Sequence, residues 1–123
     1  EQITLKMINI KSFRFAITGL AHALYLERNM KLHFVALITV CITAAITHCS
    51  PVEWSLLILC FSVVIGLETM NTAIEKNCDM TTTYYSSEIR IIKDVAAGAV
   101  FFASVCSAVI GMIILLPKIL ELI

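Results

Sequence analysis

The sequence lacks the glycine-rich loop with which many nucleotide-binding proteins hold phosphate groups. Its four glycines are far apart and never form a G-x-x-x-x-G-K pattern. It also lacks a C-x-x-C pair and any Cys and His cluster with the spacing of a metal site, so we expect the five cysteines to be small apolar packing residues. Phosphate binding, if present, would therefore have to rely on side chains and a metal ion.

Neither sign of charge is in excess, since nine Lys and Arg residues balance nine Asp and Glu residues. This balance gives no indication of a nucleic-acid partner, and we expect none. A cleaved signal peptide is not expected either. The first long apolar run begins only after residue 31, and no small-residue cleavage site follows a short apolar core.

Long stretches without any charged residue are the main feature that is present. Hydrophobic residues make up 59% of the chain, and residues 32–52 and 95–117 contain no Lys, Arg, Asp or Glu. A helix needs about 20 apolar residues to cross a bilayer, so both stretches are long enough. The uncharged run 54–67 is too short alone, but a helix from Trp54 to Glu75 would measure about 33 Å. We therefore predict a third spanning helix, with Glu68 inside it.

The predicted fold is all-α and integral to the membrane, in one domain that covers residues 1–123. The predicted membrane-spanning helices are residues 30–49, 52–79 and 89–116, and Pro117 is expected to end or kink the last of them. Residues 12–29 predict an amphipathic helix in the headgroup layer, because Phe13 and other apolar residues recur at helical spacing beside basic residues.

The positions of Lys and Arg predict the orientation in the membrane. Five basic residues lie before or at the start of the first span, none lies in the turn after it, three lie in or beside the next loop and one lies in the tail. Basic residues concentrate in cytoplasmic loops. We therefore expect the N-terminus and the loop of residues 76–93 to be cytoplasmic and the C-terminus to lie outside.

A polar face on the second spanning helix is the strongest candidate for a site. Glu68, Asn71 and Glu75 are spaced by three and four residues, so they share one face of a helix, and Asp79 lies one turn further along. Charges inside a membrane are costly, and they usually mark functional sites. We expect these side chains to do chemistry rather than to pack.

The entries of the other two spanning helices bring further polar groups to the same membrane boundary. Glu27 precedes the first span, and Lys93 and Asp94 begin the third. Oxygen ligands beside a cation suggest Mg²⁺ with a phosphorylated ligand. A carboxylate can also accept the proton of an attacking hydroxyl. Together these groups predict phosphoryl transfer by positioning and electrostatics.

A non-enzymatic membrane protein, with carboxylates along an ion path, is the alternative from another class. A pore would need polar residues along the whole length of a helix. The first and third spans are apolar throughout, and the polar groups crowd one end. This distribution favours a site at the membrane surface, open to a soluble nucleotide and to a lipid headgroup.

Three segments resemble the small prokaryotic diacylglycerol kinase family. They are "LETMNTAIEKNCD", "IKDVAAGAV" after a short loop, and "ERNMKLH" before the first span, the last as in Gram-positive members. The resemblance extends over about residues 12–120. It implies a homotrimer in the bacterial cytoplasmic membrane, with active sites shared between neighbouring chains. It also implies transfer of the γ-phosphoryl of MgATP to a lipid hydroxyl.

The resemblance also assigns roles by motif. Glu27 and Glu75 are similar to the metal ligands, and Glu68 to the general base that meets the lipid substrate, although Glu75 is an alternative base. The residues that resemble nucleotide contacts are Asn71, Glu75, Lys93, Asp94, Tyr85 and Arg14. Gram-positive members mostly phosphorylate undecaprenol, so we expect that acceptor, with diacylglycerol as the alternative.

Overall fold

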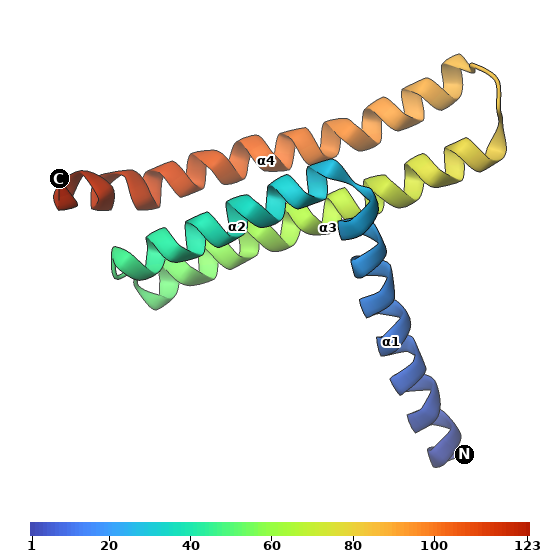
Figure 1. The fold of residues 1–123 in the computed structure, drawn as a ribbon, viewed down its shortest axis with the longest axis horizontal. Coiled ribbons are helices and arrows are strands. Elements are labelled where there is room, and N and C mark those ends of the chain that lie inside the picture. Colours follow the sequence, from blue (N-terminus) through green and yellow to red (C-terminus); the bar gives the residue numbers. More distant parts are fainter.

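The computed structural model describes the backbone of residues 1–123 and all of their side chains except those of residues 6–8. Four helices follow one another, namely α1 (Gln2–Leu26), α2 (Arg28–Ile46), α3 (Pro51–Thr81) and α4 (Ser87–Leu122). Helices α2, α3 and α4 run alongside one another, whereas α1 leads away from them (Figure 1). The predicted all-α fold is confirmed.

Helices α2, α3 and α4 are each long and apolar enough to cross a membrane, as the sequence predicts. Their ends differ from the predicted ones. α2 ends at Ile46 rather than at residue 49, and α4 continues through Pro117 to Leu122. Proline removes one backbone donor and disfavours a helix interior, but here the flanking turns keep their helical conformation, so Pro117 does not end α4.

Helix α1 begins at Gln2, ten residues before the predicted start at residue 12. No proline or glycine interrupts residues 2–11, so nothing in their covalent chemistry stops the helix. Phe13 and Phe15 are both largely exposed although they project from different sides of the helix. The predicted amphipathic face is therefore not evident, and the location in the headgroup layer remains a prediction.

The turn between α2 and α3 is closed by two complementary caps. At the end of α2, the backbone N–H groups of His48 and Cys49 donate to the carbonyls of Ala45 and Ala44, with His48 at a φ of 55°. This is the Schellman arrangement, here without the usual glycine. At the start of α3, the Ser50 hydroxyl accepts from the N–H of Glu53, whose carboxylate accepts from the N–H of Ser50.

The best-packed apolar cluster lies at this same end of the three helices. Ala44, Leu57 and Leu115 are buried together, one from each of α2, α3 and α4. Glu53 at the start of α3 also pairs with Lys118 near the end of α4, with Nζ to Oε1 at 3.4 Å. The turn end of the bundle is therefore capped, packed and ion-paired, while the opposite end carries the polar residues.

The single chain exposes an unusual amount of apolar surface. Its accessible area is 9276 Å², whereas a compact protein of this mass exposes about 6,600 Å². Large apolar side chains such as Ile58, Phe101 and Phe102 are mostly exposed on the long helices. Such surface needs a bilayer or further chains to cover it.

We predict that Ser50→Ala lowers the free energy of unfolding by about 1 kcal/mol, because it removes the side-chain half of the capping box. Denaturant titration in detergent micelles measures this change. Ser55→Ala is the matched control, since the Ser55 hydroxyl donates only to the Pro51 carbonyl of the same helix. Equal losses in both variants would contradict a capping role.

Candidate active site

The face of α3 predicted to carry the chemistry turns inward at the end of the bundle away from the α2–α3 turn. Glu68, Asn71 and Thr72 are its buried polar residues, and Glu68 is only 2% exposed. The Thr72 hydroxyl donates to the Glu68 carbonyl and so needs no other partner. Glu68 and Asn71 thus bring a carboxylate and an amide into an otherwise apolar interior.

His33 of α2 lies against the Glu68 carboxylate. Its Nε2 atom is 3.6 Å from Glu68 Oε2. Among the described residues, no other side chain comes within ion-pair or hydrogen-bond distance of this carboxylate. The contact joins α2 to α3 at the depth of the buried charge.

Asn71 leaves one strong acceptor without a partner. Its Nδ2 group donates to Glu75 Oε1 at 3.4 Å, while its buried Oδ1 atom accepts from no described group. Glu75, seven residues beyond Glu68 and thus about 10 Å further along the helix, is half-buried and nearer to water. A free amide oxygen beside a carboxylate is a donor set that suits a hard cation.

A magnesium ion fits these residues only in company with other ligands. The side chains that the structure describes contain no group of three or more His, Cys, Asp or Glu able to hold a metal. Glu27 and Glu75 both lie near enough to Glu68 for their charges to interact with it. Mg²⁺ commonly takes one or two carboxylates and completes its shell with water and phosphate oxygens. A magnesium ion held by these carboxylates would therefore need water and phosphate oxygens to complete its shell.

Two cavities meet at His33. The first, of about 260 Å³, lies among α2, α3 and α4 and is lined by Asn29, Leu32, His33, Glu68, Asn71, Ala97, Val100 and Phe101. The second is an apolar groove of about 480 Å³ that runs from His33 toward Leu116 and Ile119. Small α4 residues such as Ser107 and Gly111 line this groove and leave room between the helices. We call the first the polar cavity, after the four polar side chains among the eight that line it, and it adjoins the apolar groove.

The basic and acidic groups at the start of α4 are engaged in ion pairs. Lys93 Nζ lies 2.6 Å from Asp79 Oδ1 at the end of α3. Arg90 Nε lies 3.3 Å from Asp94 Oδ1 one turn along α4. Neither Lys93 nor Asp94 lines the cavity beside Glu68. Both residues lie at the polar end of the bundle, on its outer part.

Glu27 is the residue that joins α1 to α2, and it has an extended backbone and is half-buried. The turns of helix around it are well packed, since Ala23 and Met30 are buried. The junction therefore holds Glu27 at the same end of the bundle as Glu68 and Glu75.

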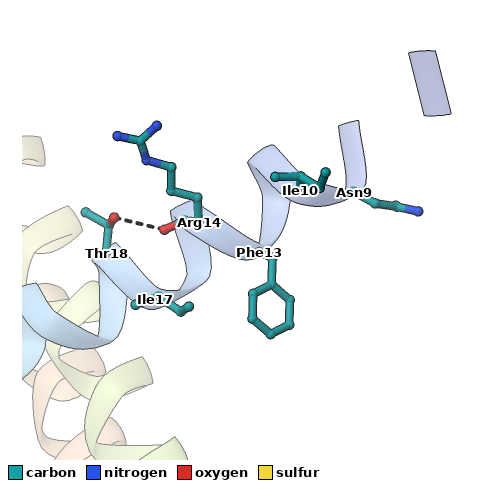
Figure 2. Close-up of a pocket in the computed structure, with 6 residues that line it drawn as sticks. All are labelled: Asn9, Ile10, Phe13, Arg14, Ile17 and Thr18. Atoms are coloured by element: carbon teal, nitrogen blue, oxygen red, sulfur yellow. Dashed lines mark hydrogen bonds between the residues drawn. The ribbon is translucent and has the colours of Figure 1, made fainter. Parts of the chain in front are cut away.

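Arg14 and Tyr85 are not brought to this cluster. Tyr85 is 85% exposed in the connection between α3 and α4. Arg14 lies about 18 Å along α1 from the end of that helix at Leu26. It lines a shallow hollow of about 510 Å³ formed by α1 alone, and its guanidinium projects to the other side from Phe13 (Figure 2). Nothing in the single chain closes this hollow.

Two contacts of the structure are not predicted from the sequence, namely the contact of His33 with Glu68 and the ion pair of Asp79 with Lys93. A signal for His33 was present, because Asn29, His33, Ala36 and Val40 repeat at helical spacing and all face the two cavities. Which α3 residue this face meets depends on how far α2 is shifted along α3, and the sequence does not state that shift.

The chain is similar to known proteins over most of its length. A family described as prokaryotic diacylglycerol kinase matches residues 14–115. The chain is 35% identical over 112 residues to a diacylglycerol kinase of Synechocystis sp.. The aligned region covers 90% of this chain and 64% of that protein. It is also 37% identical over 108 residues to an undecaprenol kinase of Bacillus subtilis, and that aligned region covers 88% of each of the two proteins. No solved structure matches the chain.

Proposed function

Because the chain belongs to the prokaryotic diacylglycerol kinase family, whose members are lipid kinases, we propose that it transfers the γ-phosphoryl of MgATP to the hydroxyl of undecaprenol. The family membership confirms the class of enzyme predicted from the motifs. It leaves the acceptor lipid open, because relatives named for both lipids are similarly identical. Diacylglycerol is the second candidate acceptor.

The observation that carries the proposal is the position of Glu68, buried where a polar cavity adjoins an apolar groove. A lipid alcohol has both characters, with a hydroxyl at one end and a long apolar chain. The hydroxyl can meet the carboxylate while the chain lies along the helices. A carboxylate in this place can accept the hydroxyl proton as the oxygen attacks phosphorus.

The choice of undecaprenol rests on the motifs shared with Gram-positive members, together with the similarity to the Bacillus subtilis undecaprenol kinase. The similarity to the Synechocystis diacylglycerol kinase is nearly as high, so it keeps the alternative in place. The apolar groove suits either acceptor, because each carries long hydrocarbon chains.

The remaining roles are proposed from the family motifs. Glu27 and Glu75 would hold Mg²⁺, which when bound offsets negative charge on the phosphates and orients them. Asn71, whose Oδ1 atom has no described partner, lies beside Glu75, because its Nδ2 group donates to that carboxylate. Lys93 would exchange Asp79 for a phosphate oxygen, and Asp94 would contact the nucleotide beside it.

Arg14 and Tyr85 are proposed nucleotide contacts that the single chain leaves far from Glu68. They could reach a nucleotide if a neighbouring chain supplied them. The large apolar surface supports assembly of several chains, and the family resemblance suggests three. An active site shared between chains would also close the open side of the polar cavity.

The proposed orientation places the polar end of the bundle at the cytoplasmic face, where ATP is available. The N-terminus and the α3–α4 connection are then cytoplasmic, and the C-terminus lies outside. The distribution of Lys and Arg supports this orientation.

The decisive experiment is a phosphoryl-transfer assay with labelled ATP, in which purified protein in detergent receives undecaprenol or diacylglycerol in parallel. We expect Mg²⁺-dependent labelling of both lipids or one, with the higher kcat/KM for undecaprenol. A higher kcat/KM for diacylglycerol would reverse the ranking. Absence of labelling with either lipid would refute the kinase proposal.

We predict that Glu75→Gln lowers kcat at least about a hundredfold, because losing a metal ligand weakens phosphate charge stabilisation worth several kcal/mol. Glu121→Gln is the matched control, an exposed carboxylate at the far end of α4. The same labelled-ATP assay compares them. Full activity of the Glu75 variant would exclude its role as a metal ligand.

We predict that Glu68→Gln lowers kcat by about a hundredfold to ten-thousandfold, the usual contribution of a general base. KM for MgATP should stay within about twofold, because the side chain acts on the acceptor hydroxyl. Steady-state kinetics at varied MgATP separate the two effects. If the variant loses only affinity for ATP, Glu68 is a nucleotide-binding residue and not the base.

A further inference from the structure

We infer that His33 is a positioning residue that holds the Glu68 carboxylate in the orientation needed to receive the proton of the lipid hydroxyl. The inference rests on the proposed function, in which Glu68 is the base. It adds a residue to which neither the sequence motifs nor the comparisons assign a role.

The first support is the contact itself. His33 Nε2 lies 3.6 Å from Glu68 Oε2, slightly beyond a direct hydrogen bond and within reach of one after a small side-chain rotation. The two residues come from different helices, α2 and α3, so the contact is not a by-product of helical spacing. Glu68 is almost fully buried, and His33 is partly buried.

The contact with His33 leaves the second oxygen of the Glu68 carboxylate free. With Oε2 facing His33, the other carboxylate oxygen, Oε1, has no described side-chain partner. Glu68 lines the polar cavity, so an oxygen without a partner is available to an incoming hydroxyl. Holding one oxygen and leaving the other open is what a positioned base requires.

The third support is the place of His33 between the two cavities. It lines both the polar cavity with Glu68 and the apolar groove that continues along α3 and α4. A lipid lying in the groove would bring its hydroxyl past His33 before meeting Glu68. The histidine is therefore placed at the point where acceptor and base come together.

Physical chemistry explains why such a partner is needed. A buried carboxylate is costly unless it is hydrogen-bonded or paired. The α4 side chains that line the cavity, Ala97, Val100 and Phe101, are apolar and cannot donate. The Asn71 amide of α3 donates to Glu75 instead. A single N–H group from α2 offsets part of this cost and limits the rotation of the carboxylate. Misplacement of a reacting group by about 1 Å can cost a hundredfold in rate.

The test compares His33→Phe, which keeps a ring but removes the donor, with His33→Gln, which keeps an N–H donor. We expect His33→Phe to lower kcat about tenfold to a hundredfold while KM for MgATP stays within about twofold. His33→Gln should recover a substantial part of kcat. Equal losses in both variants, or a change in KM for MgATP alone, would overturn the positioning role.

His22→Phe and His22→Gln form the matched control pair, because His22 is exposed on α1 and contacts no described carboxylate. Both should keep the wild-type kcat. Labelling of the lipid by the wild-type protein distinguishes failure of the His33 inference from failure of the kinase proposal. An active wild type with an unaffected His33→Phe variant refutes only the role of His33, whereas an inactive wild type refutes the kinase function.

A double-mutant cycle makes the test independent of general damage to the fold. If His33 acts through Glu68, then adding His33→Phe to Glu68→Gln should leave the residual rate unchanged within about twofold. A further tenfold loss would show that the histidine acts elsewhere. Size-exclusion profiles in detergent confirm that all variants keep the wild-type assembly.

Discussion

The structure depends on the cost of burying the charge of Glu68 among apolar helices. A carboxylate in hydrocarbon is stable only where donors or cations can reach it. Polar residues of all three long helices gather at one end of the bundle, and His33 is the one described side chain within ion-pair distance of this carboxylate. His33 comes from α2, Asn71 and Glu75 follow Glu68 on α3, and Lys93 lies in the second turn of α4. The same requirement places the proposed site at the membrane boundary rather than at the middle of the bilayer.

The two ends of the bundle consequently serve different purposes. At the α2–α3 turn, the capping box and the Schellman arrangement satisfy the backbone groups that helix ends leave free. The buried cluster of Ala44, Leu57 and Leu115 and the pair between Glu53 and Lys118 join the helices there. Stability concentrated at that end allows the opposite end to stay open.

The apolar groove has a comparably simple origin. Small side chains on α4, such as Ser107 and Gly111, cannot fill the space that Phe61 and Met112 border from either side. In a soluble protein such a gap would be a defect of packing. Beside a bilayer it can admit a hydrocarbon chain, and it leads to His33 and Glu68. In the proposed function, a lipid in the apolar groove would meet Glu68 at the position of His33, which lines both cavities.

Much of this architecture can be predicted from the order of residues. Apolar runs of sufficient length predict the spanning helices, and the spacing of Glu68, Asn71 and Glu75 predicts a common face, because helical geometry and hydrocarbon thickness are nearly independent of context. Motifs within that face also identify the family. The start of α1 and the passage of α4 through Pro117 are less predictable, since helix propensity near such residues is weak and neighbouring turns decide the outcome.

Contacts between helices are not predicted from the sequence. Nothing in the sequence states how far α2 is shifted along α3 or how α4 is rotated, and these two quantities decide that His33 meets Glu68 and that Lys93 meets Asp79. The sequence by itself determined the helices, their polar face and the family. Only the tertiary structure decided the partner of the buried carboxylate, because that partner depends on side-chain packing summed over the whole length of three helices.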